Sequence, residues 1–328
     1  MTPRQHQEYI KDLKSKYMDL KNEIDRQIAI IREKVVQCDP VALLSFSADM
    51  FLTSLLGVQS EIQVSREEVP TARMAEYIQS ILVSSPNNFI DNDEESDPSK
   101  MFFSIQNDIN RLYKTINQFY MSWGVCLQDI HPDWDEALIM TVVESQMLYI
   151  VRGQRYQVFE IEYFEKLLCV HNDIFKKLFD LNTSDIVEGI KKLQYSLSQG
   201  KMDAINKMEK LFDEFSNNEY INTEEFIEDH RKEGGEFFDE FFGTKLRDVL
   251  EVTSWNDKFV QELSYSLNEE KKFFEENDFA GWPVIDLPIQ KRPFIKLKDK
   301  YYCFDYYSFM DNFYRAVQKT ITRVAPDY

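Results

Sequence analysis

Residues 4–36 read RQHQEYIKDLKSKYMDLKNEIDRQIAIIREKVV, and apolar side chains recur through this run at steps of three or four. The apolar positions are Ile10, Leu13, Tyr17, Leu20, Ile24, Ile28, Ile31 and Val35. This period predicts one long amphipathic helix with Lys and Glu on its other faces. The spacing resembles that of a coiled coil, but Ile28 shifts the stripe and an ordinary bundle helix fits equally well. Self-association through this helix therefore stays open.

The rest of the chain continues in helices. Asp39-Pro40 has the residue types of a helix N-cap and first turn, and the apolar run 41–56 follows. Further helices are expected near 67–84, 99–122, 133–151, 156–180, 183–200, 201–216, 223–233, 235–251, 254–266 and 268–276. Gly234-Gly235 is expected to break one of them. The 9 Gly and 10 Pro are few for 328 residues, which favours long helices with few connections.

The pattern changes in GWPVIDLPIQKRPFIKLKDKYYCF, residues 281–304, where three of the ten prolines lie. Two apolar and aromatic runs flank Lys298-Asp299-Lys300, which predicts a β-hairpin. Asp305 then starts a last helix, about 305–323. We therefore expect a mainly α protein, an irregular multi-helix array with a small β-hairpin near the C-terminus. Its expected parts are a helical domain 1–122, an acidic helical domain 123–280, and the hairpin with its terminal helix, 281–328.

The charge is strongly negative and unevenly placed. The chain has 38 Lys+Arg and 57 Asp+Glu, for a formal net charge of −19. Residues 203–290 contain 23 acidic and 9 basic residues, whereas residues 291–328 contain 8 basic and 4 acidic ones. An acidic protein repels phosphate backbones, so any nucleic-acid binding must be local. Solvated acidic helix faces are the alternative explanation of the charge.

Compartment and membrane association follow from what the chain lacks. The N-terminal residues contain no apolar signal-peptide core. The longest apolar run, 41–57, is shorter than a membrane span and carries Asp49 in its middle, so we expect a buried core helix. The four Cys form no CxxC pair, which argues against a zinc cluster. We expect a cytoplasmic protein with reduced thiols and no membrane partner.

Known catalytic and metal-binding patterns are also missing. The sequence contains no GxSxG, GxGxxG or GxxxxGK[ST] motif, so we assign no catalytic residue and no cofactor and favour a protein that is not an enzyme. Two acidic clusters are the weak candidates for a carboxylate–histidine metal site between helices. They contain Glu162, Glu165 and His171 in the first, and Glu228 and His230 in the second. The alternative is that each is a solvated helix face.

Two aromatic groups offer binding surfaces. Phe237, Phe238, Phe241 and Phe242 form one broad apolar helix face, which is either core or a docking surface for a partner. In the hairpin, basic residues alternate with aromatic ones, a combination that suits single-stranded nucleic acid. The candidates are Lys291, Arg292, Lys296, Lys298, Lys300 and Tyr301. A charged hairpin edge that resists aggregation is the alternative.

Residues 281–317 resemble a segment of large bacterial proteins through Pro293, Phe294, Ile295, Tyr301, Tyr302 and Phe304. Those proteins have a long helical N-terminal region, a similar hairpin and helix, and then a nuclease domain of the restriction-endonuclease-like fold. The resemblance implies that this chain is the N-terminal part of a longer protein or a version without the catalytic part. No nuclease residue carries over to this sequence, because in the family those residues lie beyond the matched segment.

These observations favour a non-catalytic helical interaction or regulatory module of a bacterial assembly, associated with a nuclease. Its expected partner is another protein or a downstream domain of its own. A metal-dependent enzyme and local nucleic-acid binding through the basic hairpin are the two alternatives.

Overall fold

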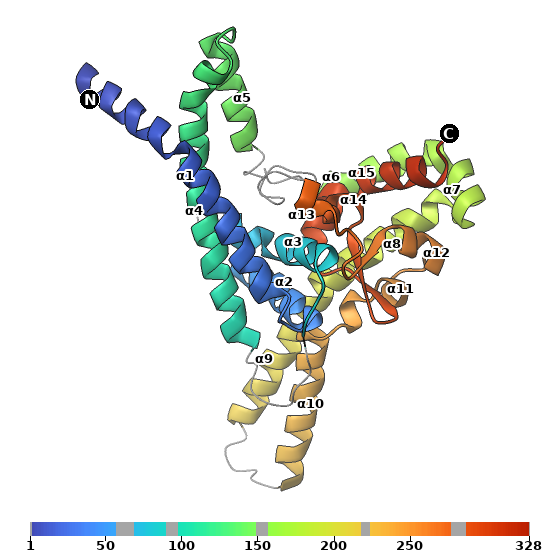
Figure 1. Cartoon of the computed structure of the whole chain (residues 1–328). Coiled ribbons are helices and arrows are strands. Elements are labelled where there is room, and N and C mark those ends of the chain that lie inside the picture. Colours follow the sequence, from blue (N-terminus) through green and yellow to red (C-terminus); the bar gives the residue numbers. More distant parts are fainter. Residues whose placement is uncertain are drawn as a thin grey trace.

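The computed structural model describes residues 2–56, 69–89, 98–148, 157–217, 224–276 and 287–327. Within these ranges the protein is mainly α-helical, as expected, and it has a small three-stranded sheet near the C-terminus. Figure 1 shows α1 (Pro3–Val35) and α4 (Pro98–Ile130) at one side and the sheet with the last helix, α15 (Tyr306–Val324), at the other.

The long helices are α1 (Pro3–Val35), α2 (Pro40–Leu56), α3 (Val69–Ser84), α4 (Pro98–Ile130), α5 (Glu136–Leu148), α6 (Gln157–Leu168), α7 (Asn172–Phe179), α8 (Thr183–Tyr195), α9 (Lys201–Asn217), α10 (Glu224–Phe242) and α15 (Tyr306–Val324). The short helices are α11 (Val249–Val252), α12 (Asp257–Glu262), α13 (Phe273–Glu276) and α14 (Pro288–Lys291). A π-helix, Ser196–Gly200, joins α8 to α9, and 3₁₀ turns occupy Cys169–His171 and Lys245–Arg247. The strands are β1 (Ser264–Ser266), β2 (Phe294–Leu297) and β3 (Lys300–Tyr302).

Side-chain caps explain where several helices begin. Thr2 and Gln5 form a capping box at α1, and Asn182 with Asp185 forms one at α8. Asp39 accepts a hydrogen bond from the Ala42 N–H at 2.9 Å at the start of α2. The same geometry recurs where Asp305 caps α15. Each cap satisfies an N–H that the first helical turn leaves without a partner.

The predicted hairpin is present, with a third strand added. β2 pairs antiparallel with β3, so that Ile295 lies opposite Tyr302. β1 pairs parallel with β2, with Ser264 opposite Phe294. The predicted helix 254–266 is wrong at its C-terminal end, because α12 stops at Glu262 and the chain becomes extended to pair with β2.

The sheet lies between two hydrophobic cores. The first core is formed mainly by α1–α4 and the second mainly by α6–α8, α12 and α15. Side chains of β2 alternate between them: Ile295 and Leu297 join the first core, and Phe294 joins the second. The expected division at 280/281 would therefore separate β1 from its partner β2, and the division at 122/123 would cut α4.

Helix boundaries differ from expectation in several further places: α4 continues to Ile130, the expected helix 235–251 is interrupted after Phe242, and the expected helix 268–276 begins only at Phe273. α10 runs without a break through Gly234-Gly235, so the predicted break there is wrong. α10 packs along α9, and the tertiary contact outweighs the low helix propensity of two glycines. The predicted helix 156–180 is divided by the 3₁₀ turn into α6 and α7.

α1 and α4 are antiparallel and connected by polar contacts along their length. Lys34 Nζ lies 2.5 Å from Asp108 Oδ2, and Lys14 Nζ lies 2.5 Å from Asp129 Oδ2 near the other end. The N-terminal turns of α1, residues 2–9, are exposed and project from the body (Figure 1). The α9–α10 hairpin projects at the opposite end (Figure 1).

Candidate interaction surface and buried charge cluster

Helix α5 is rich in apolar residues, and they are not gathered on one face. Its sequence, EALIMTVVESQML, has eight apolar residues that are spread around the helix together with five polar ones. A helix with apolar residues on several sides is normally buried on more than one side. Here α4 is its main contact among the described elements, and Ile139 is the one buried side chain between residues 136 and 144.

The end of α4 together with α5 exposes several large apolar side chains. The exposed fractions are 50% for Met121, 49% for Ile130, 44% for Leu138 and 50% for Met140. We call residues 121–144 the α4–α5 tip. Gly124 lets the two helices approach closely, since a Cβ there would lie 3.0 Å from Val143 Cγ2. The tip is thus a thin two-helix hairpin with apolar groups on more than one side.

The tip is also acidic. Residues 129–148 contain five Asp or Glu and no Lys or Arg. Lys14 of α1 pairs with Asp129, and the rings of His131 and Trp134 stack at 4.0 Å in the turn between the helices. The remaining acids face no basic residue of their own segment. A segment that covers the tip must therefore offer apolar groups together with positive charge.

A second feature is a buried cluster of three charged side chains. Asp49, Lys201 and Arg247 are 3%, 1% and 1% exposed. Arg247 Nη2 donates to Asp49 Oδ1 at 2.5 Å, and Lys201 Nζ lies 3.5 Å from the same oxygen. Arg247 Nη1 also donates to the carbonyl oxygen of Phe304 at 3.3 Å. One carboxylate thus faces two cations, which joins α2, the start of α9 and the turn before α11.

The surroundings of Lys201 disfavour its charged form. Burial and the neighbouring charge of Arg247 together lower the pKa of Lys201 to about 7, although Asp49 partly opposes both. The ring of Phe241 lies 4.9 Å from Lys201 Nζ and is the cluster's aromatic neighbour on α10. Sequence reasoning missed this cluster. Its one local signal was Asp49 inside the apolar run 41–57.

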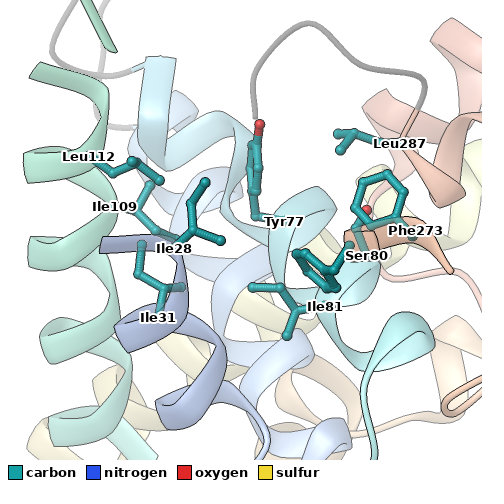
Figure 2. Close-up of a pocket in the computed structure, with 10 residues that line it drawn as sticks. Ile28, Ile31, Tyr77, Ser80, Ile81, Ile109, Leu112, Phe273 and Leu287 are labelled. Atoms are coloured by element: carbon teal, nitrogen blue, oxygen red, sulfur yellow. The ribbon is translucent and has the colours of Figure 1, made fainter. Parts of the chain in front are cut away.

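An apolar pocket lies where α1, α3 and α4 meet (Figure 2). Ile28, Ile31, Ile81, Ile109, Leu112, Phe273, Phe274 and Leu287 line it, with Tyr77 and Ser80 as the polar members. Specific ligand sites set several polar groups around an apolar pocket. Two hydroxyl groups from one helix provide little to orient a ligand, so we interpret the pocket as imperfect packing between the three helices.

The Phe-rich face of α10 contributes to the α9–α10 contact at the two positions whose side chains are described. Phe237 and Phe241 are half-buried, and their rings lie 5.9 Å from Lys207 Nζ and 4.9 Å from Lys201 Nζ of α9. The side chains of Phe238 and Phe242 lie outside the described residues. Contact with α9 accounts for the first two, and a docking role for this face stays a prediction.

The basic residues of the hairpin are mostly paired with acids. Arg292 lies 2.6 Å from Glu269, Lys291 lies 3.9 Å from Glu270, and Lys300 lies 2.8 Å from Asp248. The hydrogen bonds that Lys300 donates to Asp248 and Glu251 raise its pKa above the usual value.

The aromatic residues of the hairpin are buried. Tyr301 is buried with Lys296 Nζ 5.1 Å from its ring, and Phe294 belongs to the second core. Lys298 occupies the tight turn with φ 57°. Base stacking on these aromatic rings has no support in this arrangement, and nucleic-acid binding stays a prediction.

The metal-site candidates are dispersed. Glu162 is exposed on α6, Glu165 pairs with Lys191 at 2.8 Å, and His171 is half-buried in the 3₁₀ turn. On α10, Glu228 lies 3.7 Å from Arg231, and His230 is half-buried. Across the described ranges, no group of three or more His, Cys, Asp or Glu side chains is arranged to hold a metal ion.

Comparison with known protein families, with characterised proteins and with solved structures gives no match to this chain. None of the helices in the described ranges is long and apolar enough to cross a membrane.

Proposed function

We propose that this protein is a non-catalytic helical interaction module, and that the α4–α5 tip is the surface that binds its partner. The observation that carries the proposal is α5 itself, a helix with apolar residues on several sides that packs mainly against α4 among the described elements. Large apolar groups left in water favour burial in an interface. Leu138 and Met140 lie on different sides of α5 and are both exposed.

The partner that fits is a basic, apolar helix of another protein. Five acidic residues and no basic ones between 129 and 148 select against an acidic partner and favour Lys or Arg beside the apolar contacts. Association with a nuclease is a narrower proposal. It rests on the resemblance of residues 281–317, and the partner would then be a component of a bacterial nuclease assembly.

The test uses a synthetic amphipathic peptide of Leu and Lys as the probe, with binding followed by fluorescence polarisation. We expect the intact protein to bind it, and Leu138→Glu or Met140→Glu to weaken binding by about tenfold, equivalent to ~1.4 kcal/mol each. Val170→Glu is the matched control, because Val170 is an exposed apolar residue outside the tip. It adds the same charge there and should leave the affinity unchanged.

Two results would count against the proposal: no binding by the unmodified protein, or equal weakening by Val170→Glu. Light scattering after size exclusion separates self-association from binding to a different protein. A dimer that Met140→Glu dissociates would identify a second copy as the occupant of the tip.

A further inference from the structure

We propose that Lys201 is a proton-controlled latch, which holds the α9–α10 hairpin on the body while its amine is neutral and loosens the hairpin when the amine is protonated. This regulatory role is independent of the α4–α5 tip, which lies at the other end of the molecule (Figure 1). It rests on three observations: the composition of the buried cluster, its position at the base of the hairpin, and the irregular helix that precedes it.

The composition leaves one buried positive charge in excess. Asp49 Oδ1 is the acceptor of the strong contact from Arg247 Nη2, at 2.5 Å, and Lys201 Nζ approaches the same oxygen only to 3.5 Å. Lys201 Nζ has no well-aligned hydrogen-bond partner among the described residues, and Asp49 lies only at ion-pair distance from it. With Lys201 neutral, the Asp49–Arg247 pair is balanced. With Lys201 protonated, two buried cations share one carboxylate, and the excess positive charge is costly at low dielectric.

The position makes this charge relevant to the hairpin. Lys201 is the first residue of α9, and Phe241 in the last turn of α10 places its ring 4.9 Å from Lys201 Nζ. Asp49 lies on α2, which α10 also contacts. Both ends of the hairpin therefore meet the body at this amine.

The chain before Lys201 is a π-helix, Ser196–Gly200. Such segments carry one residue more per turn than an α-helix and are found mostly as single turns, often at functional sites. Ser196 Oγ donates to the carbonyl oxygen of Leu246 at 2.8 Å, which fastens the start of this turn to the body. The π-helix can therefore serve as a hinge on which α9 moves while α8 stays in place.

Two charged groups of the described residues act on Lys201. Asp49 comes from α2 and Arg247 from the 3₁₀ turn. On α9 itself, Asp203 bonds to Tyr195 and Gln199. Glu240 of α10 lies 3.1 Å from Lys207 Nζ and 3.7 Å from Lys245 Nζ.

The direction of the pH effect follows from proton linkage. The pKa of Lys201 is about 7 when the hairpin is seated, compared with 10.5 for a free lysine. The opened hairpin therefore binds more protons, and lowering the pH favours opening. With these two values, the opening equilibrium rises about tenfold between pH 8 and pH 6 and becomes flat at lower pH.

Hydrogen exchange on the intact protein tests the latch. Amide exchange of α9 and α10 would be measured from pH 6 to pH 9 and corrected for the intrinsic exchange rate at each pH. We expect opening of these helices to increase about tenfold from pH 8 to pH 6, with little change in α4. Lys201→Met should remove this dependence. Lys207→Met is the matched control on the same helix, because Lys207 is solvent-accessible, and it should leave the dependence intact.

Lys201→Gln provides a second variant, which keeps a hydrogen-bond donor for Asp49 without the charge. It too should show opening that does not depend on pH. The proposal is overturned by a wild-type hairpin whose opening is independent of pH. It is equally overturned if either Lys201 variant keeps the wild-type dependence.

Discussion

Gly189 and Gly235 both lie inside helices, and the structure predicts opposite effects when each is replaced by Ala. Gly189 is on α8, where Trp255 lies against the helix backbone. A Cβ at Gly189 would be 2.2 Å from Trp255 Nε1 and 2.4 Å from its Cε2. Gly235 is on α10, and a Cβ there would have nothing within 4 Å.

The indole ring cannot retreat easily from Gly189. Its Nε1 donates to the carbonyl oxygen of Asp185 at 3.1 Å, one turn before Gly189 on the same helix. Its other face stacks on Phe313, with 5.8 Å between ring centroids and 7° between planes. Overpacking a closed core costs about 1–3 kcal/mol, and more when neighbours cannot move. Alanine returns roughly 1 kcal/mol of helix propensity, so from the upper end of that range we expect Gly189→Ala to lose about 2 kcal/mol.

For Gly235→Ala, the gain in helix propensity is the only expected effect, because the new Cβ meets no neighbouring atom. We expect the free energy of unfolding to rise by about 0.5–1 kcal/mol. Urea unfolding, followed by circular dichroism and tryptophan fluorescence, would measure both variants against the wild type. The reasoning is refuted if Gly189→Ala is as stable as the wild type, or if both substitutions change the stability in the same direction.

Three further predictions concern buried polar groups. Asp49→Asn should lower the free energy of unfolding by about 3–5 kcal/mol in urea titrations, because Arg247 and Lys201 lose their buried counterion; a loss below about 1 kcal/mol would contradict this. Lys201→Met should stabilise the protein most at pH 7 and below. The gain in stability should disappear as the pH approaches 10.5, because the wild-type amine then becomes neutral in the unfolded state as well as in the folded state. A gain that is constant with pH would contradict this prediction. Ser80→Ala should be neutral or stabilising by up to ~1 kcal/mol in thermal denaturation, since Ser80 Oγ is buried without a hydrogen-bond partner in the described structure. A clear loss of stability would show that Ser80 makes an interaction that this geometry does not include.

Local signals in the sequence predicted most of the fold. The period of apolar residues in α1 and the caps at Asp39 and Asp305 act within a few residues, and each is present in the structure. The β2–β3 hairpin is also local. β1 could not be predicted in this way, because Ser264–Ser266 is extended through pairing with a strand about thirty residues later.

The buried charge cluster could not be predicted from local sequence signals either. Asp49, Lys201 and Arg247 are far apart in sequence, and neither basic residue stands out among its neighbours. In the β2–β3 hairpin, by contrast, the local pattern was predicted correctly but the surroundings of its side chains were not. Its basic and aromatic residues alternate as expected, but burial of Tyr301 and pairing of Arg292 with Glu269 depend on segments that a local pattern does not contain.

The position of β2 between the two cores has a consequence for synthesis of the protein. Ile295 and Leu297 complete the core of the first helices, although those helices emerge from the ribosome long before residue 294. Until then the apolar faces of α1, α3 and α4 lack part of their cover. Nascent chains with such exposed surfaces are prone to aggregate, so this protein has a long interval of synthesis during which a chaperone would shield its N-terminal helices.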